Sequence, residues 1–311
     1  MRVLLAKDFD AAIAASKSLK KDIVAIETEY GDKKLDESYD GIEICLNHHF
    51  PIQDNIPPSA AYTLFKNKKS YNKFIISHVD LDTIFGMLWA GKWIKPTREN
   101  FFIANLIAYC DNYGIHNTIN YVKELPKNIH DKYLYLGYLV NSWIIHDNGY
   151  SLKDITKEIK KLLLRISDVL NLEKIPDEKM TEVYKWLEAQ QEQAEKYLID
   201  EFALGDLDIF IYSAPFKLTT AYEINGKKAD IIIQLHQTTG AITLSCRNEE
   251  IAISVFGLQG VIEPLNIFFG KNAGGKLSIG GSPRNKRFSL KDLDKFKKFI
   301  IEYINNSKEK D

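Results

Sequence analysis

Residues 74–93, FIISHVDLDTIFGMLWAGKW, pass from a short apolar strand directly into a helix. Further apolar stretches that predict buried strands lie at residues 3–6, 23–26 and 42–46, and an alanine-rich stretch at residues 11–19 predicts a helix. This alternation of short strands and helices predicts an α/β fold with an open, mainly parallel sheet. Ligands of such sheets bind beyond the carboxyl ends of the strands. Polar residues that follow a predicted strand are therefore the first candidates for a functional site.

Two changes of pattern along the chain predict three parts. Residues 1–125 hold the strand–helix alternation and predict an α/β domain. Residues 126–206 have a helical pattern that becomes polar toward its end, which predicts a helical connector. Residues 207–311 predict a smaller α+β domain. Its β-rich stretches are residues 210–213, 231–235, 241–245 and 251–255, and a final amphipathic helix covers residues 290–304.

The composition limits the kind of partner that this chain can bind. Its 311 residues are 45% hydrophobic, which is enough for more than one core. With 41 basic and 42 acidic residues the formal net charge is −1, whereas proteins that coat long nucleic acid are usually strongly basic. We therefore expect no long nucleic acid as a partner. A small phosphorylated compound or a short oligonucleotide stays compatible with this charge, and a homodimer is left open.

The cysteines and the absence of long apolar stretches predict a cytoplasmic location. Cys45, Cys110 and Cys246 are far apart and odd in number, so they predict reduced thiols rather than a disulfide framework or a thiolate zinc site. The first fourteen residues carry charges where a signal peptide is apolar. No apolar run approaches the 18 residues typical of a membrane span. We expect no membrane partner.

The strand at residues 74–77 is followed at once by His78, Asp80 and Asp82. In an extended chain a spacing of two residues places side chains on one face, so these three would converge. One imidazole and two carboxylates suit a divalent cation such as Mn²⁺ or Mg²⁺. The alternative is that an aspartate caps the following helix, which accounts for one of the two aspartates but not for all three residues.

A second predicted strand, at residues 42–46, is followed by Asn47, His48 and His49. Paired histidines can divide their roles, one binding a metal and the other contacting a phosphoryl oxygen or leaving group. For a His-His pair in isolation, a loop without such a role is the alternative. The position of this pair at a strand end favours the functional interpretation.

Asp111 lies in an otherwise apolar helical stretch, where a lone carboxylate is costly to bury and a metal ion would be a suitable partner. The alternative is a helix that ends at residues 112–114 and leaves Asp111 exposed. His116 is a weaker candidate. Asp8 and Asp10 form a further acidic pair after the first predicted strand.

A run of positive charge lies in the C-terminal part. From Pro264 to Lys291 there are six basic residues and no acidic one. Paired glycines let backbone N–H groups approach an anion, and a guanidinium at a strand end suits phosphate. The predicted anion-binding residues are Arg247, Gly274, Gly275, Lys276, Gly280, Gly281 and Arg284. The alternative is a glycine hairpin with solvated charges.

These motifs together resemble the DHH phosphoesterase superfamily, which includes RecJ-type exonucleases, oligoribonucleases and cyclic-dinucleotide phosphodiesterases. The H-x-D-x-D motif at residues 78–82 and the N-H-H motif at residues 47–49 are similar to its metal-binding motifs. The S-C-R segment at residues 245–247 and the glycine pairs at residues 274–275 and 280–281 resemble the Ser-x-Arg strand and glycine loop of the C-terminal domain associated with that family.

The resemblance implies a metal-dependent phosphoester hydrolase with two Mn²⁺ (or Mg²⁺) ions. The implied metal ligands are His48, His78, Asp80, Asp82 and Asp111. His49 would contact the scissile phosphate and, with Asp82, would count as catalytic. Arg247 and the glycine loop would hold the other end of the substrate across a cleft between the domains. The implied reaction is in-line hydrolysis of a short oligonucleotide or a nucleotide-like phosphoester.

This chain also departs from the family pattern. Asn47 stands where the signature aspartate belongs, Thr83 where a glycine follows, and Lys276 where the loop has a histidine. The N-H-H motif precedes the H-x-D-x-D motif, which reverses the usual order. Either the motifs are permuted or Asp8 and Asp10 are the first motif. The rival functions are a non-catalytic nucleotide- or phosphate-binding protein, which the neutral Asn47 favours, and a structural protein whose strand-end acids are helix caps.

Overall fold

The computed structural model describes most of the chain and divides it into two compact units. The described residues are 1–30, 33–47, 60, 69–123, 125–143, 150–218, 221–224, 226–270 and 273–308, with only the backbone of residues 112–123, 190, 191 and 193. The first unit holds Met1–Asn112, Thr118–Ile145 and Tyr150–Trp186, and the second consists mainly of Leu187–Asp311.

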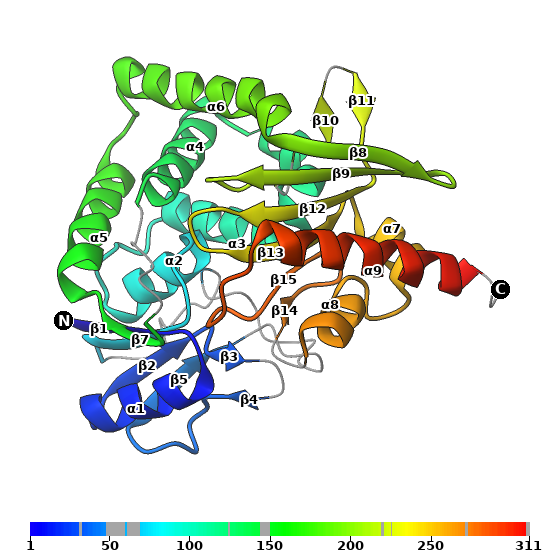
Figure 1. Ribbon diagram of the computed structural model, residues 1–311. Coiled ribbons are helices and arrows are strands. Elements are labelled where there is room, and N and C mark those ends of the chain that lie inside the picture. The colour runs from blue at the N-terminus through cyan, green and yellow to red at the C-terminus, as the bar shows by residue number, and fades with distance from the viewer. Residues whose placement is uncertain are drawn as a thin grey trace. The chain divides into compact units, whose positions relative to one another are not determined.

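The first unit is built on a five-stranded sheet (Figure 1) with the strand order β5-β2-β6-β1-β7. Its strands are β1 (Arg2–Ala6), β2 (Ile23–Ile26), β5 (Ile42–Leu46), β6 (Lys73–Ile76) and β7 (Leu152–Asp154). The pairs β5·β2, β2·β6 and β6·β1 are parallel, and β7 is antiparallel to β1. All four residues of β2 are fully buried, as expected for a central strand covered on both faces.

Helices connect and cover these strands. They are α1 (Phe9–Leu19), α2 (Leu81–Ala90), α3 (Arg98–Lys123), α4 (Lys127–Asn141), α5 (Thr156–Asn171) and α6 (Asp177–Tyr197), which continues into the second unit. A short hairpin of β3 (Glu29–Tyr30) and β4 (Lys33–Lys34) follows β2. Helix α1 begins where the Asp8 carboxylate accepts a hydrogen bond of 2.8 Å from the Ala11 N–H, and its alanine face packs on the sheet.

The second unit has a six-stranded sheet with the order β14-β15-β13-β12-β9-β8. Its strands are β8 (Leu198–Leu204), β9 (Leu207–Ala214), β12 (Ile231–His236), β13 (Ala241–Cys246), β14 (Gly274–Gly275) and β15 (Ile279–Gly281), with a separate pair of β10 (Glu223–Ile224) and β11 (Lys227–Lys228). Its helices are α7 (Glu249–Phe256), α8 (Ile262–Phe269) and α9 (Leu290–Lys308). Only β9 and β12 pair in parallel among the described strands of this sheet.

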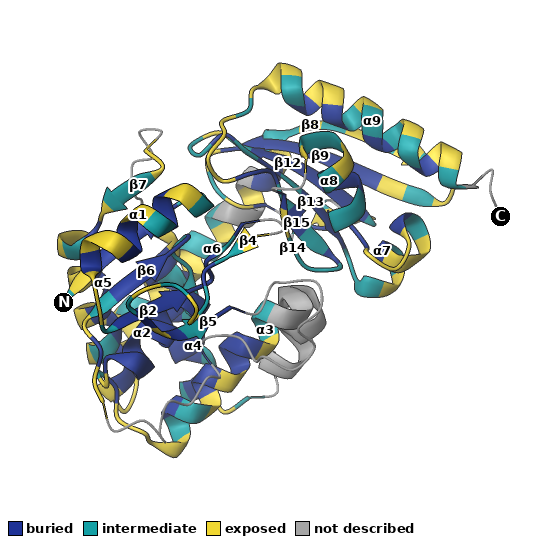
Figure 2. Cartoon of the chain, turned by 90° about the horizontal axis from the view of Figure 1, so that it is seen from below, coloured by how far each residue is buried: buried dark blue, intermediate teal, exposed yellow. Residues whose placement is uncertain are grey.

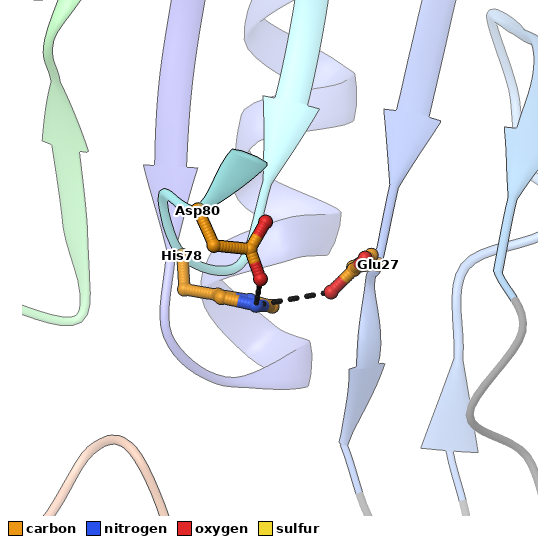
Figure 3. Close-up of side chains that lie close together, drawn as sticks. All are labelled: Glu27, His78 and Asp80. Atoms are coloured by element: carbon orange, nitrogen blue, oxygen red, sulfur yellow. Dashed lines mark hydrogen bonds and ion pairs between the residues drawn. The ribbon is translucent and has the colours of Figure 1, made fainter. Parts of the chain in front are cut away.

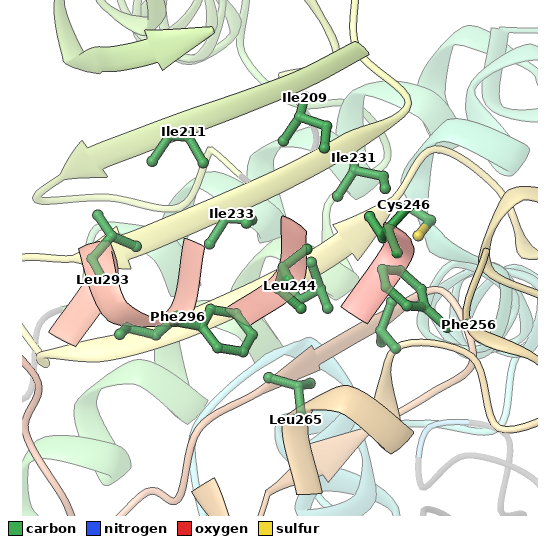
Figure 4. Close-up of a cluster of buried hydrophobic side chains, with 14 of the residues drawn as sticks. Ile209, Ile211, Ile231, Ile233, Leu244, Cys246, Phe256, Leu265, Leu293 and Phe296 are labelled. Atoms are coloured by element: carbon green, nitrogen blue, oxygen red, sulfur yellow. The ribbon is translucent and has the colours of Figure 1, made fainter. Parts of the chain in front are cut away.

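The core of the second unit lies between the sheet and its three helices. Isoleucines of β9 and β12 meet Phe296 of α9, Phe256 of α7 and Leu265 of α8 (Figure 4), and all three are at most 2% exposed. The inner face of α9 is buried and its outer face is exposed (Figure 2). This one-sided pattern is the reason that the sequence predicted the last helix correctly.

The predicted fold class is confirmed, with three local corrections. The first is that residues 152–154, within the predicted helical connector, form strand β7 of the first sheet. The chain has a parallel-rich N-terminal sheet, helices in the middle and a sheet-rich C-terminal region. The predicted β-rich stretch at residues 251–255 is wrong, because it belongs to helix α7, whose start is capped by the Asn248 side chain accepting from the Ile251 N–H at 2.8 Å. The polar helix α6 gives way to strand β8 at Leu198, within the stretch predicted as a helical connector.

None of the described helices combines the length and the apolar character that are needed to span a membrane.

Candidate metal centre

Three neighbouring strands of the first unit end at the same edge of the sheet. Ile26 of β2 is paired in register with Ile76 of β6 and with Leu46 of β5. The residues that follow these strands therefore emerge side by side, because the pairs are parallel. They are Glu27 after β2, Ser77 and His78 after β6, and Asn47 after β5.

Glu27, His78 and Asp80 form the first group of potential metal ligands (Figure 3). His78 Nε2 lies 3.0 Å from an Oε2 of Glu27 and 3.0 Å from Oδ2 of Asp80. The other ring nitrogen, Nδ1, lies 2.8 Å from the Ser77 hydroxyl. One ligand atom from each of the three residues lies within 4.8 Å of the others. A nitrogen and two carboxylates at this spacing can hold one divalent cation.

Asp80 uses its two carboxylate oxygens differently. Oδ1 accepts a hydrogen bond of 2.8 Å from the Thr83 N–H and so caps helix α2, while Oδ2 faces His78. The Asp80 side chain can therefore cap a helix and also serve as a potential metal ligand. Burial and the neighbouring Glu27 carboxylate raise the pKa of Asp80. The charge and hydrogen bond of His78, together with the Thr83 N–H, outweigh both and lower this pKa to about 2.

Glu27, Asp82 and Asp111 form a second group, whose ligand atoms also lie within 4.8 Å of one another. Asp82 lies in the first turn of α2, is 2% exposed, and accepts a hydrogen bond of 2.8 Å from the Ala60 N–H. Asp111 projects from α3, and this helix continues to Lys123 instead of ending at residues 112–114. The carboxylates of three separate elements thus approach one another.

The extended geometry expected for residues 78–82 is wrong. The chain turns into α2 at Leu81, so Asp82 stands on a helix and not on the face shared by His78 and Asp80. The three residues are consequently divided between two groups. Glu27 belongs to both groups and connects them.

Glu27 is the residue that the sequence analysis missed. It is fully buried and has a φ of 52°, in the left-handed region that costs a side-chain-bearing residue about 1–2 kcal/mol. Strained backbone of this kind persists where the surrounding structure enforces it, and it is common at functional sites. The signal was present in the sequence, because Glu27 directly follows the predicted strand at residues 23–26.

Asn47 holds the segment that carries Glu27. Its Oδ1 accepts hydrogen bonds from the backbone N–H and the hydroxyl of Thr28, at 2.8 and 3.1 Å. Its Nδ2 donates to the Leu35 carbonyl at 2.6 Å, and the side chain is buried. A carboxylate could not make the last of these bonds, because it has no donor. The amide at this position is therefore explained by its hydrogen bonds to the backbone.

The structure does not join the other sequence candidates to either ligand group. His48 and His49 lie outside the described residues, as does the side chain of His116. Asp8 caps α1, Asp10 is exposed, and neither belongs to a ligand group among the described residues. The place of His48 and His49 in the site therefore stays a prediction.

In the second unit, Arg247 follows strand β13 and is already paired. Its Nη2 lies 2.8 Å from Oδ1 of Asp230, and its side chain is 39% exposed. The backbone N–H of Arg247 also donates to the Asp230 carbonyl at 2.8 Å. The guanidinium is thus held at the end of the strand with part of its surface open to solvent.

The predicted phosphate loop forms a hairpin of β14 and β15, in which Gly274 pairs with Gly281 and Gly275 with Gly280. A Cβ at Gly275, whose φ is 152°, would lie 2.3 Å from the Ile279 carbonyl oxygen, and a Cβ at Gly280 would lie 2.6 Å from Leu265 Cδ1. Close packing therefore accounts for Gly275 and Gly280, whereas a Cβ at Gly274 would meet nothing within 4 Å. Arg284 is exposed beyond the hairpin. Anion binding by this hairpin stays a prediction.

Comparisons with known proteins do not place this chain in a family. No family model matches the sequence, and no curated protein matches it. A similar solved structure is an uncharacterized protein from Helicobacter pylori G27, with 14% identity over 96% of this chain and 87% of the other, and a TM-score of 0.21. A second is a proposed family II inorganic pyrophosphatase from Methanococcus jannaschii, with 10% identity over 89% of this chain and 81% of the other, and a TM-score of 0.20. Similarities at these TM-scores carry no argument about fold or function.

Proposed function

We propose that this protein is a metal-dependent phosphoester hydrolase of the DHH type. The observation that carries this proposal is the pair of ligand groups that share Glu27, one with His78 and Asp80 and the other with Asp82 and Asp111. A carboxylate common to two groups is suited to bridge two metal ions, as in the two-metal sites of phosphatases and nucleases. Four carboxylates and one imidazole form a donor set that fits Mn²⁺ or Mg²⁺.

Bound metal ions would lower the pKa of a water molecule and neutralise the charge of the phosphoryl group. The chain itself holds the ligands in position. Ser77 orients His78, the Thr83 N–H holds Asp80, and the Ala60 N–H holds Asp82. Such supporting contacts fix the geometry of a site before a ligand arrives. His48 as a further ligand, and His49 as a contact to the scissile phosphate, are the parts of this proposal that rest on the sequence motif.

Glu27 supplies a carboxylate that compensates for the neutral side chain of Asn47. The neutral amide at the signature position removes one negative charge from the expected site and favours a binding protein that has lost catalysis. In this structure a carboxylate from the adjacent strand β2 occupies the shared position between the two groups. The number of carboxylates therefore supports a site that still holds two ions.

The substrate that we propose is a short oligonucleotide or a nucleotide-like phosphoester. The net charge of −1 disfavours a long polyanion, and the charged groups that could bind phosphate are local. In the second unit, Arg247 and the basic residues around the glycine hairpin would hold a phosphate-bearing end of this substrate. The guanidinium of Arg247 suits a phosphate because it can donate two parallel hydrogen bonds.

The proposal is tested by metal content and turnover measured on the same preparation. Elemental analysis after dialysis against Mn²⁺ should find bound metal, and dinucleotides, a nucleotide monophosphate and pyrophosphate should be assayed with Mn²⁺ and with Mg²⁺. Hydrolysis that disappears with a chelator and returns with Mn²⁺ is the expected result. Metal and phosphate binding without turnover would favour the non-catalytic binding protein, and the absence of bound metal would favour a structural role for the acids.

A further inference from the structure

A cavity of about 480 Å³ lies between helices α4 and α5 of the first unit. This volume is within the range of small-molecule binding sites. Its apolar part comes from Leu139 and Leu162, both of which are buried. Trp143, just beyond the end of α4, lines the same cavity with a half-buried side chain. The cavity thus offers an aromatic ring beside an apolar floor.

The polar side of the cavity is basic. Lys157, Lys161 and Arg165 line it from α5, and their spacing of four residues places them on one face of the helix, over about 12 Å. All three are exposed, and none forms an ion pair with another residue in the part of the chain that the structure describes. Among the described residues of the lining, Glu158 is the single acidic one, so the basic side chains outnumber it.

This cavity is separate from the candidate metal centre. Helix α5 begins beside Val3 near the amino end of β1, where the Thr156 hydroxyl accepts a hydrogen bond of 2.9 Å from the Val3 N–H. Glu27 and His78, in contrast, follow the carboxyl ends of β2 and β6, which are parallel to β1 within the same sheet. The start of α5 and the metal centre therefore lie at opposite edges of that sheet.

We propose that this cavity is a nucleotide-binding site in which Trp143 stacks on the base and Lys161 and Arg165 bind the phosphate. A base presents a flat apolar face that an indole can cover, and such stacking tolerates any base. Three cations that form no ion pair with the described residues, spread along roughly 12 Å of helix by the helical rise, attract phosphate. This site requires neither a metal ion nor the proposed hydrolysis.

The test is isothermal titration calorimetry, which measures the affinity of the full chain for 5′-AMP in the presence of a chelator. Adenosine and inorganic phosphate are titrated separately. We expect AMP to bind more tightly than either fragment. Lys161→Gln and Arg165→Gln should each weaken AMP binding about tenfold or more, the effect of losing one charge-assisted hydrogen bond. Trp143→Ala should weaken AMP about tenfold and leave phosphate unchanged. Glu158→Gln should leave AMP binding equal or tighter, since it removes a negative charge from the lining.

Lys160→Gln is the matched control, because Lys160 is exposed on the same helix but does not line the cavity. It should bind AMP as the parent does. A Glu27→Gln variant should also keep its AMP affinity in the chelator, which separates this site from the metal centre. The proposal is overturned if AMP does not bind, if Lys160→Gln weakens AMP as much as Lys161→Gln, if Trp143→Ala has no effect, or if Glu27→Gln abolishes binding.

Discussion

The two units place charged side chains just beyond buried strands in different ways. In the first unit, Glu27 and His78 leave adjacent parallel strands and meet carboxylates from α2 and α3. In the second unit, Arg247 leaves β13 and meets Asp230, so that one positive and one negative charge form a pair. The first arrangement gathers several carboxylates around one imidazole, and the second pairs one positive charge with one negative charge.

This difference shows what a strand-end residue can and cannot indicate. Ion pairs such as Arg247–Asp230 stabilise a structure whether or not a ligand is present. Several carboxylates brought together, one of them fully buried and on strained backbone, oppose folding unless a cation offsets their charge. The carboxylates of the first unit therefore call for an explanation other than stability, whereas the Arg247–Asp230 pair does not.

The largest effect should come from Glu27→Gln. This change keeps the size of the side chain but removes the charge shared by both ligand groups. We expect loss of bound Mn²⁺ and a fall in phosphoester hydrolysis of at least about a hundredfold, comparable to the loss of a major electrostatic contact in an active site. Elemental analysis and an assay with a dinucleotide measure the two effects.

Asp10→Asn is the control for this experiment, because Asp10 also follows a strand of the same sheet but is exposed on α1. It should leave metal content and hydrolysis unchanged. If Asp10→Asn removed the metal and Glu27→Gln did not, the first motif of the family would lie at Asp8 and Asp10 and the site described for Glu27 would be wrong.

Asn47→Asp should destabilise the protein by about 1–3 kcal/mol, the cost of an unsatisfied buried group. The new carboxylate would lose the hydrogen bond to the Leu35 carbonyl. It would also add a negative charge in contact with Thr28, the residue that follows Glu27. Urea unfolding measures this loss. Asn171→Asp, on the exposed face of α5, is the matched change and should cost much less. An Asn47→Asp variant that is as stable as the parent and more active would show that the site lacks a carboxylate.

Arg247→Ala tests the second unit. If Arg247 binds the phosphate-bearing end of the substrate, KM should rise about tenfold with a smaller change in kcat, because the lost contact is equal in ground and transition states. The rise should be greater for a substrate with a terminal phosphate. Arg2→Ala, which also breaks an ion pair with an aspartate, is the control and should leave KM unchanged. Equal kinetics for Arg247→Ala and the parent would favour a purely structural ion pair and hairpin.

The smallest effect concerns His236 at the end of β12. Burial, together with the positive charge of Lys217, lowers the pKa of this imidazole to about 4. The unfolded chain, with an ordinary pKa near 6.5, takes up the proton first as the pH falls. The stability contributed by neutral His236 is therefore complete above about pH 6.5 and is lost toward pH 4, by about 1 kcal/mol after allowance for its partial exposure. Urea unfolding at several pH values should show a flatter dependence for His236→Gln, and an unchanged slope would contradict this role.

Local sequence was sufficient to predict a strand where a short apolar run was the only pattern present. The apolar stretches of β1, β2, β5 and β6 predicted four of the five strands of the first sheet, since short buried strands leave a continuous apolar run. The fifth, β7, lies in the stretch predicted as a helical connector and was missed. The same reasoning failed at residues 251–255, because a short apolar run has no clear period and the Asn248 cap decided for a helix. It also placed Asp82 on an extended chain, although Asp80 begins a helix at that point.

By itself, the sequence determined which residue types follow which strands, and hence that ligand-type side chains lie at the carboxyl edge of an α/β sheet. Only the tertiary structure decided which of them meet. The order β5-β2-β6 is set by non-local packing, and it brings Glu27 beside His78 although fifty residues separate them along the chain. The same packing forces Glu27 into the left-handed region and fixes Asn47 on the backbone. A linear reading cannot supply these facts, because they depend on which strands become neighbours.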